Sequence, residues 1–195
     1  MARPSEFIRI KALEAATKLF WVKGYTASSL PELLETMNIA RSSFYATFGS
    51  KRSLFVECLE LLGDRTRAIV DDAAQKLPAS GIARAFFETT LLEVAPHVRE
   101  RGCLLVNSTL ELAGVDPELN RLATRKLNEV ENCFARAFML TVSRGELDTV
   151  YVPEELARLV MTINIGLRVQ SRQNLSAQEL KPTIENSLTM LGLAA

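Results

Sequence analysis

The chain has 195 residues, of which 48% are hydrophobic and 24% charged, and this composition indicates a soluble globular protein with a sizeable core. Its three cysteines are too widely spaced for a disulfide framework or a zinc signature, and no apolar run approaches the roughly 20 residues of a membrane span. The N-terminus lacks a signal-peptide pattern and the formal net charge is zero, so we expect a cytoplasmic protein whose overall charge names no partner.

Charge is divided unevenly along the chain. Residues 1–58 contain eight Lys or Arg and five Glu, so this part is mildly basic and residues 59–195 are mildly acidic. Such a division fits a nucleic-acid module attached to a part that does not touch nucleic acid.

Nearly every segment has helical spacing of its apolar residues, and no stretch alternates like a half-buried strand. We therefore predict an all-α fold. The first helix is expected to stop at Gly24. Ser29 and Glu32 have the spacing of a capping box, which predicts the start of a second helix that runs to Met37.

The remaining helices are separated by glycine, proline and polar breaks. They are expected at residues 41–48, 51–77, 81–96, 103–113, 117–143, 153–172 and 176–192. No low-complexity linker interrupts the chain. We predict two domains, a helix-turn-helix DNA-binding domain over residues 1–50 and a larger helical domain for ligand binding and dimerisation over residues 51–195.

The segment expected as the third helix divides into an inner and an outer side. The apolar residues spaced for one small shared core are Leu30, Leu33, Leu34, Ile39, Phe44 and Phe48. The outer side is then formed by Arg41, Ser42, Ser43, Tyr45, Ala46 and Thr47. Arg41 can contact guanine or a phosphate, and Ala46 can meet a thymine methyl group. This small, polar and basic face is typical of a helix that enters the DNA major groove.

Four residues are candidate phosphate contacts. Ser28 and Ser29 stand at the start of the second helix, where unpaired N–H groups and the helix dipole favour an anion. Tyr45 and Lys51 are suited to anchor phosphates, which positions a protein on DNA without reading its sequence. The alternative is that the phenylalanines are ordinary core residues and that Arg41 and Lys51 belong to a solvated rim.

Residues 24–55 read GYTASSLPELLETMNIARSSFYATFGSKRSLF, and this ordered pattern resembles the DNA-binding head of the TetR family of bacterial transcriptional regulators. The resemblance spans about residues 7–56. It implies that the remainder is the all-helical ligand-binding and dimerisation body of that family. It also implies double-stranded operator DNA as a partner, a homodimer and a small-molecule inducer, with no cofactor or metal.

Two positions depart from the family pattern. Ala40 stands where relatives usually carry a Ser or Thr N-cap, so the start of the recognition helix is expected to be weaker by about 1 kcal/mol. Ala46 replaces a larger polar residue, so base reading is expected to depend on Arg41, Ser43 and Thr47. Neither departure argues against DNA binding.

A second segment suggests how such a regulator is switched. Cys103, Asn107 and Glu111 recur every four residues and so share one side of a helix. Cys103 begins that helix, with Arg99 and Arg101 just upstream, and both a helix N-terminus and nearby cations favour a reactive thiolate. The Gly-Cys-Leu run also resembles the TetR-family subgroup that includes the repressor of N-ethylmaleimide reductase, which implies electrophile sensing. The alternative is that Cys103 is a small buried hydrophobic residue.

Further pocket candidates are Phe87, Phe134 and Asn164, although phenylalanines at helical spacing usually form plain core. The last two expected helices carry apolar residues around much of their circumference, which predicts a four-helix dimer interface. The interface residues expected from this pattern are Leu156, Val160, Ile163, Leu167, Leu188 and Leu191. Burial within one chain, against the 117–143 helix, is the alternative.

Three functions compete at this point. A dimeric repressor released by a ligand or an electrophile accounts for both informative segments. An enzyme is not supported, because the chain has one histidine and lacks a Gly-x-Ser-x-Gly motif, metal-ligand spacing and a glycine-rich phosphate loop. An all-helical ligand-binding protein without DNA binding would have no need of Arg41, Tyr45 and Lys51 in their present order.

Overall fold

The computed structural model describes residues 3–147 and 150–194, with side chains from residue 9 onward. Every regular element in these ranges is a helix, which confirms the all-α prediction. The chain forms two compact units: the first comprises residues 1–62 with 103–126, and the second comprises residues 63–102 with 127–195. None of the helices within the described ranges combines the length and the apolar character that a membrane span needs.

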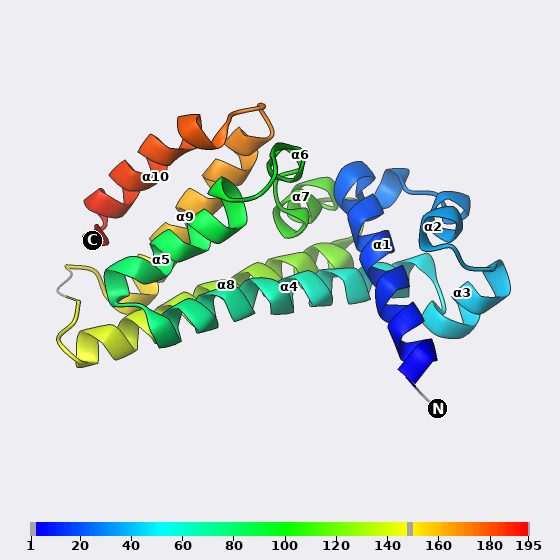
Figure 1. Ribbon diagram of the computed structural model, residues 1–195, viewed down its shortest axis with the longest axis horizontal. Helices are drawn as coiled ribbons and strands as arrows, with labels where there is room; N and C mark the ends of the chain where they lie inside the picture. Colours follow the sequence, from blue (N-terminus) through cyan, green and yellow to red (C-terminus); the bar gives the residue numbers. More distant parts are fainter. Residues whose placement is uncertain (1–2, 148–149, 195) are drawn as a thin grey trace. The chain divides into compact units, whose positions relative to one another are not determined.

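The first unit is built around three helices at the start of the chain. They are α1 (Arg3–Ala27), α2 (Leu30–Met37) and α3 (Arg41–Phe48). The unit also contains the first part of α4 (Lys51–Lys76), α7 (Leu104–Glu111) and the first part of α8 (Pro117–Ser143). Figure 1 shows α2 and α3 lying next to each other beside α1.

Local sequence explains where α2 begins and ends. The Ser29 and Glu32 side chains each bond the other residue's backbone N–H, so the predicted capping box is present. Asn38 ends the helix in the left-handed conformation, with φ at 53°. The first helix differs from the prediction, because helical structure resumes after a break at Gly24, where φ is 82° and ψ is 175°.

The core of the first unit is largely aromatic and aliphatic. Phe20 and Phe55 pack edge to face with ring centroids 4.8 Å apart, and Tyr25 lies 4.8 Å from Phe55. Other buried side chains of this unit include Ala16, Leu33, Met37, Phe44, Phe48, Leu54, Leu105 and Leu112. Of the six residues predicted for the helix-turn-helix core, Leu33, Phe44 and Phe48 are buried. The other three, Leu30, Leu34 and Ile39, are only partly buried.

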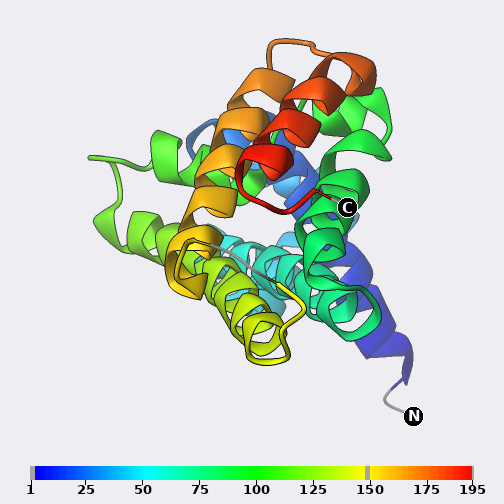
Figure 2. The same cartoon turned by 90° about the vertical axis from the view of Figure 1, so that its left-hand side faces the viewer.

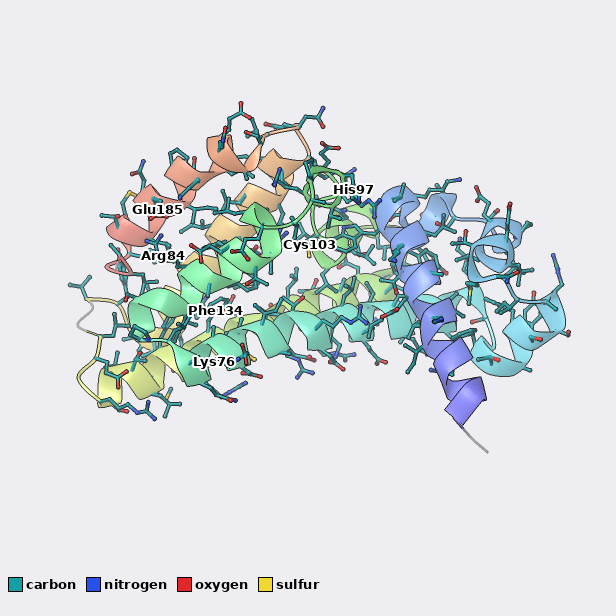
Figure 3. The ribbon with its side chains drawn as sticks, viewed as in Figure 1. Lys76, Arg84, His97, Cys103, Phe134 and Glu185 are labelled. Atoms are coloured by element: carbon teal, nitrogen blue, oxygen red, sulfur yellow. The ribbon has the colours of Figure 1, made fainter. Side chains whose placement is uncertain are left out.

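The second unit contains the remaining helices. They are α5 (Ala79–Phe87), the π-helical turn η1 (Glu88–Leu92), α6 (Pro96–Arg99), α9 (Pro153–Ser171) and α10 (Ala177–Met190), with the second parts of α4 and α8. Figure 2 shows α9 and α10 side by side. Phe86 and Phe134 pack edge to face at 5.2 Å in the centre of the core. Arg84 of α5 forms an ion pair with Glu185 of α10, and Figure 3 shows the two side chains facing each other.

The single helix predicted over residues 81–96 is wrong. The α-helix begins at Ala79, ends at Phe87 and gives way to the π-helical turn η1 before Pro96 opens α6. Two buried arginines take up the carbonyl groups of η1 and the residues after it. Arg99 donates to Leu91 O at 2.8 Å, and Arg168 donates to Thr90 O at 2.8 Å. Such tertiary partners stabilise a break that periodicity alone does not predict.

Candidate nucleic-acid interface

Helix α3 separates a buried side from an exposed one. Phe44 is fully buried and Phe48 is 4% exposed, and both rings point into the first unit. The remaining six side chains of α3 are all exposed, namely those of Arg41, Ser42, Ser43, Tyr45, Ala46 and Thr47. The structure therefore gives this short helix the outward face that the sequence predicts. That face carries one cation, hydroxyl donors and acceptors, and a methyl group, the groups that read base edges and hold phosphates.

The two ends of α3 are formed differently. Ala40 occupies the N-cap position in an extended conformation, and no side chain caps this end. At the other end Gly49 has φ of 72° and donates its N–H to Tyr45 O at 3.0 Å. The next helix then starts from Ser50, whose hydroxyl accepts the Ser53 N–H at 3.0 Å. Helices α3 and α4 are thus joined by a turn of only two residues, Gly49 and Ser50.

Ser28 does not fit its predicted role as a phosphate contact. Its side chain is buried, and its hydroxyl donates to Gly24 O at 2.6 Å. Ser28 is turned inward because its hydroxyl bonds the carbonyl four residues earlier, at the kink in α1.

Ser29 is exposed, but its hydroxyl is engaged by the Glu32 carboxylate at 2.8 Å. Glu32 also forms an ion pair with Lys23, and this contact together with the Ser29 bonds lowers the pKa of the Glu32 carboxyl to about 2. The N–H and hydroxyl of Ser29, which a phosphate would need, are therefore already occupied by the Glu32 carboxylate. This favours α3 over the start of α2 as the principal contact surface.

Lys51 is half-buried at the start of α4, where its Nζ lies 4.6 Å from the centre of the Tyr25 ring. Burial lowers the pKa of Lys51, and the negative charge of Glu111 acts in the opposite direction. The aromatic face and the carboxylate hold the ammonium group in place. Its predicted contact with phosphate remains a prediction.

The predicted sensor Cys103 occupies the N-cap position of α7 and is partly exposed. The other two cysteines are buried. Burial raises the pKa of Cys58 to about 12 and also raises the pKa of Cys133. Cys103 is thus the most accessible thiol of the three. Arg99, predicted to favour its thiolate, instead turns its guanidinium to the carbonyls that follow α5.

Glu111 was predicted to line a ligand pocket, but its carboxylate bonds the protein backbone. Its two carboxylate oxygens accept the backbone N–H groups of Tyr25 and Thr26 at 3.0 and 2.7 Å. Nearby, Arg52 pairs with Glu118 at 2.7 Å and with Asp116 at 3.3 Å. The Glu111 carboxylate therefore bonds the segment that leads into the helix-turn-helix, whereas Asp116 and Glu118 pair with Arg52 of α4. Spacing along α7 gave no signal for these contacts, because their partners lie about 85 residues earlier.

The three other pocket candidates lie in the second unit. Phe87 and Phe134 are fully buried, and both pack against Phe86. Asn164 is also buried, and its Oδ1 accepts the Nε–H of Arg168 at 3.2 Å. Phe87 and Phe134 are therefore core residues, which was the alternative to their prediction as pocket residues.

The residues predicted for a dimer interface are mostly inside the second unit. Those with buried side chains are Leu156, Val160, Leu167, Leu188 and Leu191, and Ile163 is partly buried against the same core. The apolar residues of α9 that do face outward are Ile165, 40% exposed, and Val169, 44% exposed. Gly166 lies between them, with open space where a side chain would stand.

The chain is similar to known proteins along nearly its whole length. The family model described as "Bacterial regulatory proteins, tetR family" matches residues 12–58, and "Tetracyclin repressor-like, C-terminal domain" matches residues 81–185. The chain is 27% identical to the uncharacterized HTH-type transcriptional regulator YezE of Bacillus subtilis, over 98% of this chain and 100% of that protein.

Two solved structures show the same architecture. The first is a cysteine mutant of the TetR family regulator CifR, complexed with 26-bp double-strand operator DNA. It is 29% identical with a TM-score of 0.73, over 91% of this chain and 94% of that one. The second is the reduced form of NemR from Escherichia coli, 21% identical with a TM-score of 0.80, over 94% and 95% of the two chains. At that identity NemR supports the fold alone.

Proposed function

Because the chain belongs to the TetR family of bacterial transcriptional regulators, we propose that it is a repressor whose homodimer binds a palindromic operator and leaves it when Cys103 is modified or a small ligand binds. Its relatives are DNA-binding regulators, a class without enzymatic activity. Two copies of α3 would enter successive major grooves, which lie about 34 Å apart.

The observation that carries the operator proposal is the exposed face of α3, with only Phe44 and Phe48 turned inward. Arg41 is the one cation on that helix and is suited to a guanine or a phosphate. The solved complex of CifR with its operator supports the same use of the matching region here.

The test is a gel shift with the DNA that flanks the gene, carried out at several salt concentrations. The wild-type chain is expected to bind a discrete site, with an affinity that falls as salt rises. Arg41→Ala should weaken that binding by about 1–3 kcal/mol. Arg144→Ala serves as the matched control, because Arg144 is an exposed arginine of the second unit. Failure of the wild-type chain to bind any flanking fragment would favour a ligand-binding protein without DNA binding.

The dimer proposal now rests on the outward side of α9, since Leu156 and its neighbours already have partners within one chain. Ile165 and Val169 are one helical turn apart on that side, with Gly166 beside them. A stripe of this kind, small at its centre and apolar at its flanks, allows two helices to approach closely. The homodimer of the wider family is in keeping with this surface.

Release through Cys103 is supported by its partial exposure and by its position at the start of α7. N-ethylmaleimide is a suitable probe, because it alkylates accessible thiolates. The wild-type complex with DNA is expected to dissociate after treatment, and the complex of Cys103→Ser is expected to survive. If both complexes dissociate alike, another residue is the switch.

A further inference from the structure

We propose that Glu111 is a positioning residue for operator binding, in that its carboxylate fixes the segment leading into the helix-turn-helix to the end of α7. This inference deepens the proposed function and rests on it. The contact lies wholly within the first unit, and it joins residues that are about 85 positions apart in the chain.

The break at Gly24 creates the site that Glu111 fills. Gly24 has φ of 82° and ψ of 175°, outside the helical region, so α1 is kinked here and two N–H groups just after the kink bond outside the helix. The N–H groups of Tyr25 and Thr26 donate instead to Oε2 and Oε1 of Glu111, at 3.0 and 2.7 Å. A carboxylate that accepts two N–H groups is held in both position and orientation.

Close packing makes the contact specific for glycine at position 24. A Cβ atom added there would stand 2.5 Å from Oε2 of Glu111 and 2.9 Å from its carboxyl carbon. The positive φ is itself unfavourable for other residues. Gly24 and Glu111 are thus matched, since one leaves the room that the other occupies.

The same contact extends toward α2 on one side and α4 on the other. Ser28, at the entrance to α2, is bonded through its hydroxyl to Gly24 O at 2.6 Å. The Tyr25 ring lies under Nζ of Lys51, at the start of α4, and packs 4.8 Å from the Phe55 ring. A displacement of Glu111 would therefore affect α2 and α4, the helices before and after α3 in the chain.

Helix α7 carries this residue at its last position and Cys103 at its N-cap. The helix has eight residues and is about 12 Å long, so it is a short, stiff element of roughly two turns rather than a flexible tether. Its C-terminal end is also held, because Asn120 Nδ2 donates to Thr109 O at 2.8 Å. Movement at the thiol end of α7 would thus reach the helix-turn-helix through Glu111.

The first measurement is amide hydrogen exchange of the full chain. In Glu111→Gln the exchange of the Tyr25 and Thr26 amides is expected to rise about tenfold or more, because a charge-assisted acceptor is lost. Glu118→Gln is the matched control, as it removes the same charge from an exposed ion pair with Arg52 and touches neither amide. Its exchange at these two amides should equal that of the wild-type chain.

The second measurement separates positioning from general stability. Glu111→Gln should bind its operator about tenfold more weakly, while its binding to unrelated DNA stays unchanged. In Glu111→Gln the amide oxygen could still accept one of the two N–H groups. Glu111→Ala removes both acceptor oxygens, so this variant tests the loss of the whole contact. Should Glu111→Ala not fold, as judged by circular dichroism, the two Gln measurements decide.

Unchanged exchange at Tyr25 and Thr26 in the folded Ala variant, or in the Gln variant where Ala does not fold, would overturn the inference. An operator affinity of the same variant equal to that of the wild-type chain would also overturn it. If the wild-type chain binds no operator, the proposed function fails, whereas the exchange data still test the contact itself.

Discussion

Glu32 is a surface carboxylate whose charge is fixed by its neighbours. Lys23 and Ser29 lower the pKa of this carboxyl from 4.5 to about 2 in the folded chain. A depressed pKa means that the ionised form stabilises the folded state, and that this stabilisation is complete above the unfolded value. It is lost as the pH falls through the window from about 4.5 to about 2.

We therefore expect Glu32→Gln to be less stable than the wild-type chain at pH 6 and to approach it in stability near pH 2. The measurement is urea unfolding of both chains across this range. Glu35→Gln is the control, since Glu35 is exposed on the same helix. A difference in the free energy of unfolding that stays constant with pH would contradict the assignment.

The sequence predicts the capping box at Ser29 because both partners are only three residues apart. It does not predict that Ser28 is buried. Which of two adjacent serines faces solvent depends on the backbone break at Gly24, and that break is tied to a carboxylate about 85 residues later. Similarly, the spacing of Glu111 along α7 indicates its side of the helix but not its partners.

At the scale of single elements, helix α3 has an exposed polar face but lacks a side-chain N-cap. No side chain caps it, since position 40 is alanine. Ala40→Ser is expected to raise the free energy of unfolding by about 1 kcal/mol, because a serine hydroxyl could accept an N–H of the first turn. The measurement is denaturant unfolding.

Ala46→Ser provides the comparison for this prediction, as it adds the same hydroxyl within the same helix but away from its N-cap. It should be neutral or slightly destabilising. Equal effects of the two substitutions would show that the start of α3 needs no cap.

Element boundaries were predicted well where local signals mark them. Residues 41–48 and 117–143 agree with α3 and α8 at both ends, which Gly49, Pro117 and Gly145 help to define. The break after Phe87 had no such signal. It depends on Arg99 and Arg168, whose guanidinium groups occupy the carbonyls of η1 and the residues after it. Tertiary contacts of this kind are invisible to a periodicity argument.

At the scale of the whole molecule, the sequence pattern does not separate the residues of the chain's own core from those proposed for a dimer surface. Leu156 and Val160 are apolar at helical spacing, and so they fit a chain core as well as a dimer face. The apolar pattern cannot assign these residues to the core or to a dimer face, because both environments exclude water. Only the structure distinguishes the inward side of α9 from the side that carries Ile165 and Val169.

Ile165→Glu is accordingly expected to shift the chain from dimer to monomer, because a charge would be buried without a partner in the interface. Sedimentation velocity at several concentrations is the measurement. Val115→Glu places the same charge at another exposed apolar position, 63% exposed in the turn before α8, and should leave the sedimentation coefficient unchanged. A dimer that persists in the Ile165 variant would exclude this side of α9.

The three cysteines differ in exposure and in the unit that contains them, so their labelling rates can report on unfolding. Cys58 is buried in the first unit and Cys133 in the second, whereas Cys103 is partly exposed. In the native state the Cys103 thiol would react rapidly with one equivalent of an alkylating reagent. The second and third equivalents would be consumed only as each unit opens. The labelling rates of the two buried thiols would therefore time the opening of the first and the second unit separately, in one protein and without added probes.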